Sequence, residues 1–222
     1  TSGMVSGFKN WLLKLEGFSP KFIIFYVGIN DVGIGEDVIL EDLSNNQILN
    51  PDKKEVFFDN IKSRSIIIDS IRKFKFKYLP RKGFVKYDGK LTENYKNNYN
   101  FVEYDYAKKN YDFKLLSYKY KKRVEHFLIR IDLLAQYSKK IGSVPIFINS
   151  TGSHGHKEII FTLNNSLINH CFTKNYNCID VASKLVPQMD LWRDGAHTTK
   201  KGSIAVSDII YPELKNIINK FN

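Results

Sequence analysis

Three short segments of this 222-residue chain carry side chains that could do chemistry. Asn30 follows one apolar run, His154 and His156 follow another, and near the C-terminus Asp194 precedes His197 by three residues. A carboxylate three residues before a histidine can accept a hydrogen bond from the imidazole Nδ1–H, which leaves Nε2 to act as a general base. The side-chain amide of an asparagine can donate a hydrogen bond to a developing oxyanion. Together these residues could support acyl transfer.

His154 and His156 allow two interpretations, because they could contact a substrate or ligate a metal ion. No further ligands stand at a spacing typical of a metal site, so we predict a polar loop and no bound metal. Trp192 lies just before the Asp-His pair, where its ring could form the wall of an acyl or sugar pocket or could pack in the interior. We therefore assign Trp192, His154 and His156 as possible substrate-binding residues.

The elements that must position these residues alternate along the chain. Helical spacing of apolar residues predicts helices over 4–15, 118–141, 158–172 and 204–221, and short apolar runs predict strands over 21–27, 144–148 and 178–181. The run 21–27 is nearly unbroken, which is typical of a strand buried on both faces of a parallel sheet. Pro212 should break or kink the last helix. Alternation of this kind predicts an α/β fold with a parallel sheet.

Three strands make a small sheet, since an open sheet covered by helices has about five. We therefore expect a three-layer αβα sandwich with a flavodoxin-like parallel sheet whose first strand is absent and precedes Thr1. Residues 1–222 would form a single domain, interrupted by an insertion over 33–117. Within the insertion 56–76 has a helical pattern, and 77–114, crowded with Lys, Asn and Tyr, is predicted to be a cap or a mobile loop.

The composition excludes several classes of protein. Thirty-four basic and twenty-three acidic residues give a net charge of +11, but only six of the basic residues are Arg. Proteins that contact nucleic-acid phosphates and bases favour Arg over Lys. We therefore predict no nucleic-acid partner. No apolar run reaches the roughly 18 residues that a membrane-spanning helix needs. The two cysteines, Cys171 and Cys178, are too few for a disulfide scaffold and lack zinc-site spacing, so we expect buried, inert thiols.

Three blocks of the sequence resemble a known family. Residues 28–31, GIND, look like the GxND block of the SGNH (GDSL-type) hydrolases. Residues 194–197, DGAH, followed by two threonines and Gly202, are similar to that family's last block before its final helix. Residues 1–3, TSG, resemble the second block, whose glycine supplies a backbone N–H to the oxyanion hole. The order of blocks and elements agrees with the family from residue 1 to the end, apart from the insertion.

The resemblance implies a serine-esterase site. His197 would remove a proton from the nucleophilic serine and return it to the leaving alkoxide, and Asp194 would orient His197. The oxyanion would be held by the Gly3 N–H, the Asn30 side-chain amide and the N–H of the serine itself. No cofactor is implied.

The Gly-Asp-Ser block that carries the nucleophile in this family is absent from the sequence. We expect it to precede Thr1 in the complete protein, on the first strand. Ser2 lies in the second block, where the family has oxyanion-hole backbone, and is rejected as the nucleophile. Gly28 and Asp31 are expected to support the site loop rather than to react.

The function implied is a serine ester hydrolase acting on an acyl or acetyl ester of a carbohydrate or lipid. Two alternatives stay open. An O-acyltransferase would use the same triad to pass the acyl group to a sugar hydroxyl. A catalytically inactive α/β module would instead bind a polyanion through the cationic insertion, with salt-dependent affinity. A dinucleotide site is not supported, because Gly33-Ile34-Gly35 lacks the third glycine and a following helix.

Overall fold

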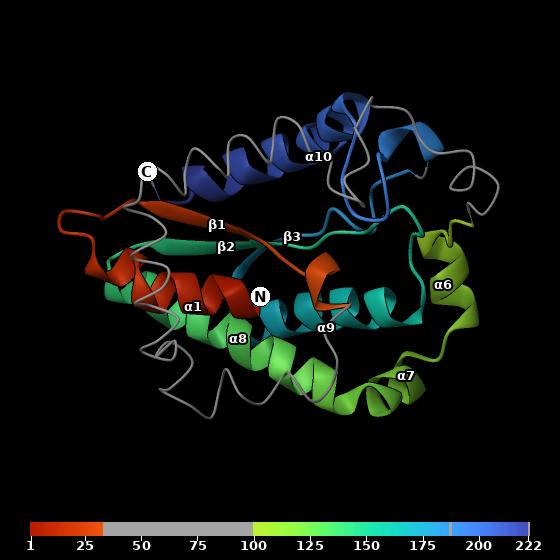
Figure 1. Cartoon of the computed structure of the whole chain (residues 1–222), viewed down its shortest axis with the longest axis horizontal. Helices are drawn as coiled ribbons and strands as arrows, with labels where there is room; N and C mark the ends of the chain where they lie inside the picture. The colour runs from red at the N-terminus through yellow and green to blue at the C-terminus, as the bar shows by residue number, and fades with distance from the viewer. Residues whose placement is uncertain (33–99, 187, 222) are drawn as a thin grey trace, which may run out of the picture. The chain divides into compact units, whose positions relative to one another are not determined.

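The computed structural model describes residues 1–32, 100–186 and 188–221. They form an α/β unit in which a three-stranded sheet packs against helices (Figure 1). The strands are β1 (Phe22–Tyr26), β2 (Val144–Ile148) and β3 (Asn177–Ile179), in the order β1-β2-β3, and both pairings are parallel. The parallel sheet predicted from the sequence is therefore present. Residues 33–99, 187 and 222 lie outside the described residues.

Helices lie on both faces of the sheet. The α-helices are α1 (Ser2–Asn10), α6 (Tyr104–Asn110), α7 (Phe113–Lys119), α8 (Lys121–Lys140), α9 (Glu158–Lys174) and α10 (Lys200–Asn219), and short 3-10 helices are η1 (Leu12–Lys14), η2 (Ile29–Asp31) and η4 (Met189–Leu191). In Figure 1, α1, α8 and α9 lie on one side of the strands and α10 lies on the other. Within the described ranges, no helix is both long and apolar enough to cross a membrane.

The core divides between the two faces of the sheet because strand side chains alternate. Phe25 and Phe147 stack, with ring centroids 5.4 Å apart, and pack with Phe8 of α1 and Phe127 of α8. On the opposite face, the buried isoleucines of β2 and β3 pack against Ile217 of α10. The helices predicted around the strands are thus confirmed, although the predicted helix 4–15 divides into α1 and η1.

Strand β1 differs from its prediction. Phe25 is buried, but Ile24 and Tyr26 on the other face are 47% and 38% exposed. In the part of the chain that the structure describes, β1 pairs with β2 alone and so forms one edge of the sheet. The expectation of burial on both faces is therefore wrong for these residues: on this face of β1, Phe22 packs in the α10 cluster and next to Phe221, whereas Ile24 and Tyr26 lie outside that cluster.

Pro212 does not break the last helix, since α10 continues from Lys200 to Asn219. Proline removes the N–H that would bond the carbonyl four residues earlier, here that of Asp208. Both Pro212 and Asp208 are exposed, so water can satisfy the freed oxygen. The predicted break is wrong because the helix loses its hydrogen bond on the solvent side.

The two cysteines form a disulfide between α9 and β3, so the prediction of free thiols is wrong. Asn175 adopts the left-handed conformation, with φ of 54°, and ends α9. The chain then turns back, and the Tyr176 N–H donates to the Cys171 carbonyl at 2.9 Å. This turn brings the Cα atoms of Cys171 and Cys178 to 6.2 Å from each other. The number of cysteines in the sequence could not have predicted this approach.

The predicted insertion over 33–117 is described only from residue 100 onward, and the helix expected at 56–76 lies outside the described residues. Residues 104–119 form α6 and α7, which pack against α9 through Ala107, Leu116 and Phe161. Asp112 caps α7, because its carboxylate accepts from the N–H groups of Lys114 and Leu115 at 2.9 and 3.1 Å. This end of the predicted cap or loop is therefore ordered helix.

Candidate functional site

The segment before α10 folds into a tight turn that joins Asp194 to His197. Asp194 Oδ1 accepts the backbone N–H groups of Ala196 and His197 at 2.9 and 2.8 Å. The same carboxylate lies 2.9 Å (Oδ2) and 3.0 Å (Oδ1) from His197 Nδ1. A carboxylate can only accept, so Nδ1 carries a proton, and in the neutral form of the ring Nε2 is then the acceptor. The predicted orientation of a general base is therefore present in the turn.

The start of α10 holds this turn in place. Thr199 caps the helix, because its Oγ1 accepts the Gly202 N–H at 3.1 Å, and its own N–H donates to the Leu191 carbonyl at 2.9 Å. A side chain at Gly202 would collide with that same Leu191 carbonyl. The threonine and the glycine that follow the histidine thus fix where the helix begins, which sets the distance from the helix to His197.

The loop after β2 supports the turn from the other side. Ser153 N–H donates to the Gly195 carbonyl at 3.1 Å. A β-carbon on Gly152 would lie 2.5 Å from that carbonyl oxygen and 2.8 Å from Ile29 Cδ1. The backbone at Gly152 therefore packs directly between the histidine turn and η2.

A surface pocket of about 360 Å³ joins the two best-matched blocks. Tyr26, Ile29 and Asn30 line it from the end of β1 and from η2. The lining residues from the turn and from α10 are Ala196, His197, Thr198, Ser203 and Val206. Asn30 and His197, predicted to serve one site, therefore share a single pocket. The His197 side chain is 76% exposed, so a ligand in the pocket could reach its ring.

Gly28 and Asp31 shape the loop that carries Asn30. Gly28 has φ of 108°, a conformation that favours glycine, and a β-carbon there would lie 3.3 Å from Asn164 Oδ1. Asp31 is buried, and its Oδ1 accepts from the backbone nitrogen and the Oγ1 of Thr1 at 2.8 and 2.7 Å. The carboxylate of Asp31 thus connects η2 to the start of α1 and does not line the pocket.

Gly3 lies in the first turn of α1, two residues after the contact between Thr1 and Asp31. It is exposed, and a β-carbon there would meet no atom within 4 Å. The first N–H groups of a helix have no acceptor within the helix. Gly3 is not among the pocket residues, so the structure brings Asn30 and His197 together but does not add Gly3 to them.

The histidines after β2 lie apart from the pocket. His156 is buried, its Nε2–H donates to the Ala182 carbonyl at 2.9 Å, and its ring contacts that of Tyr104 edge to face at 5.1 Å. Burial lowers the pKa of His156, although the bond to Ala182 and the charge of Asp180 act in the opposite direction. The ring therefore packs as a neutral group that links the loop to α6.

His154 is half-buried, and its carbonyl accepts the Val102 N–H at 3.1 Å. Burial, with a smaller contribution from the charge of Lys157, lowers the pKa of its ring. Trp192 is 1% exposed and packs with Leu185 and Leu191 against α10. None of His154, His156 and Trp192 lines the pocket that contains Asn30 and His197.

The sequence did not indicate the pocket hydroxyls of Tyr26 and Ser203. Tyr26 shares a face of β1 with Ile24, and its hydroxyl lies 3.0 Å from Ser150 Oγ. Burial raises the pKa of Tyr26. The alternation of side chains along β1 could have indicated Tyr26, because Tyr26 is the last residue of the strand on the face that also carries Ile24. Ser203, 2.8 Å from Thr198 through their hydroxyl oxygens, has no comparable signal in the sequence.

No family model, curated protein or solved structure matches the chain. The chemistry of the pocket must therefore be inferred from its own residues. It offers an oriented imidazole, an exposed side-chain amide and the hydroxyls of Tyr26, Thr198 and Ser203, beside the apolar side chains of Ile29, Ala196 and Val206. Such a pocket can take a small apolar group with a carbonyl at its mouth.

Proposed function

We propose that the chain carries the general base and one oxyanion donor of a serine ester hydrolase. The observation that carries the proposal is the shared pocket of Asn30 and His197, with Asp194 on the far nitrogen of the imidazole. His197 Nε2 takes the proton of a serine hydroxyl as it attacks an ester carbonyl, and passes it to the leaving alcohol. The Asn30 amide donates to the oxyanion that forms on the carbonyl oxygen.

The nucleophile belongs on a strand that pairs with the free edge of β1. The carboxyl ends of parallel strands meet at one edge of the sheet, where α/β folds bind ligands. A parallel strand beside β1 would thus end next to Tyr26 and Asn30, at the pocket. The half-exposed Ile24 and Tyr26 are the apolar face that such a strand and its following helix would cover. With that strand, the sheet would belong to a three-layer αβα sandwich of flavodoxin-like topology.

The pocket supports a small acyl group. Its volume of about 360 Å³ and the short side chains Ala196 and Val206 suit an acetyl or other short acyl ester better than a long chain. The alcohol side would lie toward solvent beside the exposed His197. An O-acyltransferase would use the same residues with a sugar hydroxyl in place of water, so the acceptor in the assay distinguishes the two.

The test is a fluorophosphonate reaction on the complete natural protein, followed by mass spectrometry of the labelled peptide. We expect one labelled serine, directly after a strand-like apolar run that pairs with β1. Labelling should fall by more than about tenfold in His197→Ala, because the base that activates the serine is removed. Label on Ser203 would overturn the position of the nucleophile, and the absence of any labelled serine would overturn the esterase assignment.

Kinetics with a short-chain aryl ester separate the roles of the two pocket residues. Asn30→Ala should lower kcat by about a hundredfold at similar KM, because the amide acts on the transition state. Asp208→Asn, on an exposed residue of α10 outside this pocket, is the matched control and should leave kcat unchanged. An Asn30→Ala variant with the rate of the control would remove Asn30 from the mechanism.

A further inference from the structure

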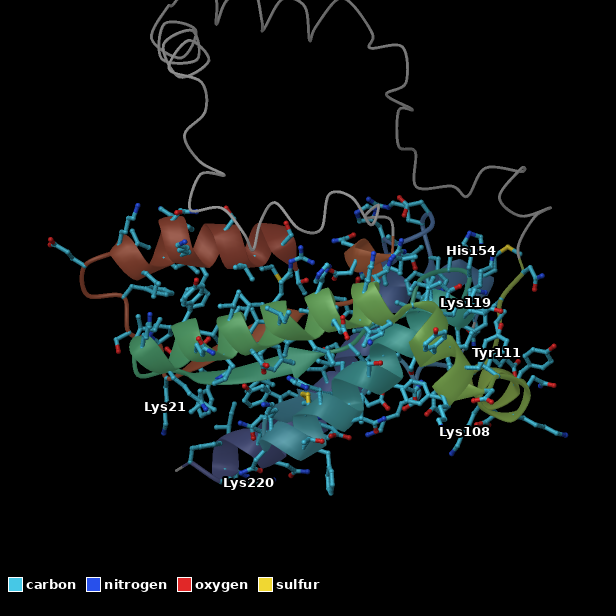
Figure 2. The ribbon with its side chains drawn as sticks, turned by 90° about the horizontal axis from the view of Figure 1, so that it is seen from below. Lys21, Lys108, Tyr111, Lys119, His154 and Lys220 are labelled. Carbon is cyan, nitrogen blue, oxygen red and sulfur yellow. A yellow bond between two sulfur atoms is a disulfide. The ribbon has the colours of Figure 1, made fainter. Side chains whose placement is uncertain are left out.

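A cluster of exposed lysines and large apolar side chains covers the outer side of α6, α7 and the first turn of α8. We call Lys108, Lys109, Lys114, Leu115, Tyr118 and Lys122 the basic-apolar surface. Figure 2 shows Lys108, Tyr111 and Lys119 around the corner that these helices form. Two residues connect α6 to α7 and one connects α7 to α8, so the members of the surface come from consecutive elements.

Among the residues that the structure describes, no carboxylate lies within ion-pair distance of the four lysines of this surface. Lys119 pairs with Glu158 at 2.5 Å, and Lys121 lies 3.9 Å from Glu125. In contrast, Lys108, Lys109, Lys114 and Lys122 form no ion pair with any carboxylate in the described parts of the chain. The carboxylate of Asp112 is occupied at the α7 N-terminus.

The apolar members of the surface are not needed for the core. Leu115 and Tyr118 are 63% and 78% exposed, whereas Leu116, on the inner side of α7, packs with Ala107 and Phe161. Leu115 and Tyr118 stand three residues apart, on one face of α7. A leucine exposed to this extent among lysines has the pattern of an interfacial helix, in which apolar side chains enter a bilayer surface and lysines contact headgroups.

We propose that the basic-apolar surface docks the protein peripherally on an anionic lipid bilayer. The lysines contact anionic headgroups, and Leu115 and Tyr118 enter the boundary between headgroups and acyl chains. An anionic polymer could also bind the lysines, but it would offer no apolar environment in which Leu115 could be buried. Because Leu115 is part of the surface, we favour a bilayer over a polymer. Figure 1 shows α6 and α7 on the side toward which the strands point.

The experiment is co-sedimentation of the 222-residue chain with vesicles. A two-to-one mixture of phosphatidylcholine and phosphatidylglycerol should bind the chain, and pure phosphatidylcholine should bind at least about tenfold less. Replacing Lys108, Lys109, Lys114 and Lys122 together by Gln should lower the partition coefficient on anionic vesicles by more than about tenfold. The double variant Leu115→Ser, Tyr118→Ser should lower it by about tenfold without changing the net charge.

A matched control separates a local surface from overall charge. Lys14, Lys174, Lys215 and Lys220 are exposed, lie outside this surface and form no ion pair with a described carboxylate. Replacing these four by Gln removes the same charge and should retain most of the binding. Circular dichroism of each variant confirms that the chain is folded.

Three results would overturn the proposal. Equal loss of binding in the control quadruple variant would show that only net charge acts. Equal partition coefficients on neutral and anionic vesicles would show that the lysines do not contribute to lipid specificity. Binding to soluble dextran sulfate as tight as to anionic vesicles, with no effect of the Leu115→Ser, Tyr118→Ser change on either, would assign the surface to a polyanionic polymer. Because no residue of this surface lines the candidate pocket, failure here leaves the esterase proposal unaffected.

Discussion

Gly152, in the loop after β2, packs against the carbonyl of Gly195, in the turn between Asp194 and His197. A β-carbon on Gly152 would lie 2.5 Å from that oxygen, while the neighbouring Ser153 N–H donates to it at 3.1 Å. The position of the histidine turn therefore depends on the absence of a side chain at residue 152. This contact connects the second strand to the candidate general base.

The first prediction follows from this contact. Gly152→Ala should destabilise the protein by about 1–3 kcal/mol, because the new methyl group must displace backbone rather than a flexible side chain. Gly195→Ala is the matched control, since a β-carbon at Gly195 would meet nothing within 4 Å, and its effect should stay within about 0.5 kcal/mol. Urea unfolding followed by circular dichroism measures both.

Chemical shifts test whether the damage in Gly152→Ala reaches the site. The His197 ring resonances should move in Gly152→Ala and stay in place in Gly195→Ala. Two results would contradict the packing described. One is an equal free energy of unfolding for the two variants, and the other is an unchanged chemical shift of the His197 ring in Gly152→Ala.

The sequence predicted those parts of the site that depend on neighbours along the chain. Asp194 and His197 meet within one turn, and Thr199 caps α10 two residues after His197, so the spacing along the chain was enough to predict this part. Trp192 is buried although it stands two residues from Asp194, because the strand-like bridge from Trp192 to Thr198 turns its side chain toward α10. Local spacing could not show on which side of that bridge the ring lies.

The features that the sequence did not predict depend on contacts between distant elements. Gly152 meets Gly195 across 43 residues (195 − 152), and no short motif records that approach. The disulfide depends on the left-handed turn at Asn175, and the exposure of Ile24 depends on which part of the sheet α10 covers. Periodicity predicted that β1 is a strand but could not show that it is an edge strand in the described chain.

The second prediction concerns acid sensitivity. The pKa of His156 is lowered in the folded protein, mainly by burial. As the pH falls below about 6.5, His156 becomes protonated in the unfolded chain but stays neutral in the folded protein. The free energy of unfolding therefore decreases toward acid pH. Below that pH the loss from this residue approaches about 1.4 kcal/mol per pH unit until the folded pKa is reached.

His156→Gln tests this titration, because glutamine keeps an N–H donor near the Ala182 carbonyl but does not titrate. Unfolding free energies at pH 7.5 and about pH 5.5 should differ less in the variant than in the natural chain. His154, whose pKa is also lowered, supplies a second contribution, so His154→Gln serves as the comparison. An identical pH dependence in the natural chain and His156→Gln would show that the folded ring is protonated as easily as the unfolded one.

The third prediction concerns the disulfide between Cys171 and Cys178. The bond closes a short loop, seven residues in sequence separation, and in the chain-entropy account a loop of this length contributes about 2–3 kcal/mol to stability. Reduction with dithiothreitol should therefore lower Tm, and the double variant Cys171→Ser, Cys178→Ser should have the lowered Tm without reductant. Because Cys171 belongs to the core beside α8, Cys178→Ser alone separates the loss of the bond from the loss of a buried sulfur.

Mass spectrometry of the alkylated, unreduced chain provides the independent check on that bond. Protein folded under oxidising conditions should carry no alkyl group on either cysteine, and reduction should expose both together. If Cys178 is alkylated without reduction while Tm is unaffected by dithiothreitol, the two sulfurs are free thiols, and α9 is joined to β3 only by packing and by the Tyr176 hydrogen bond to Cys171.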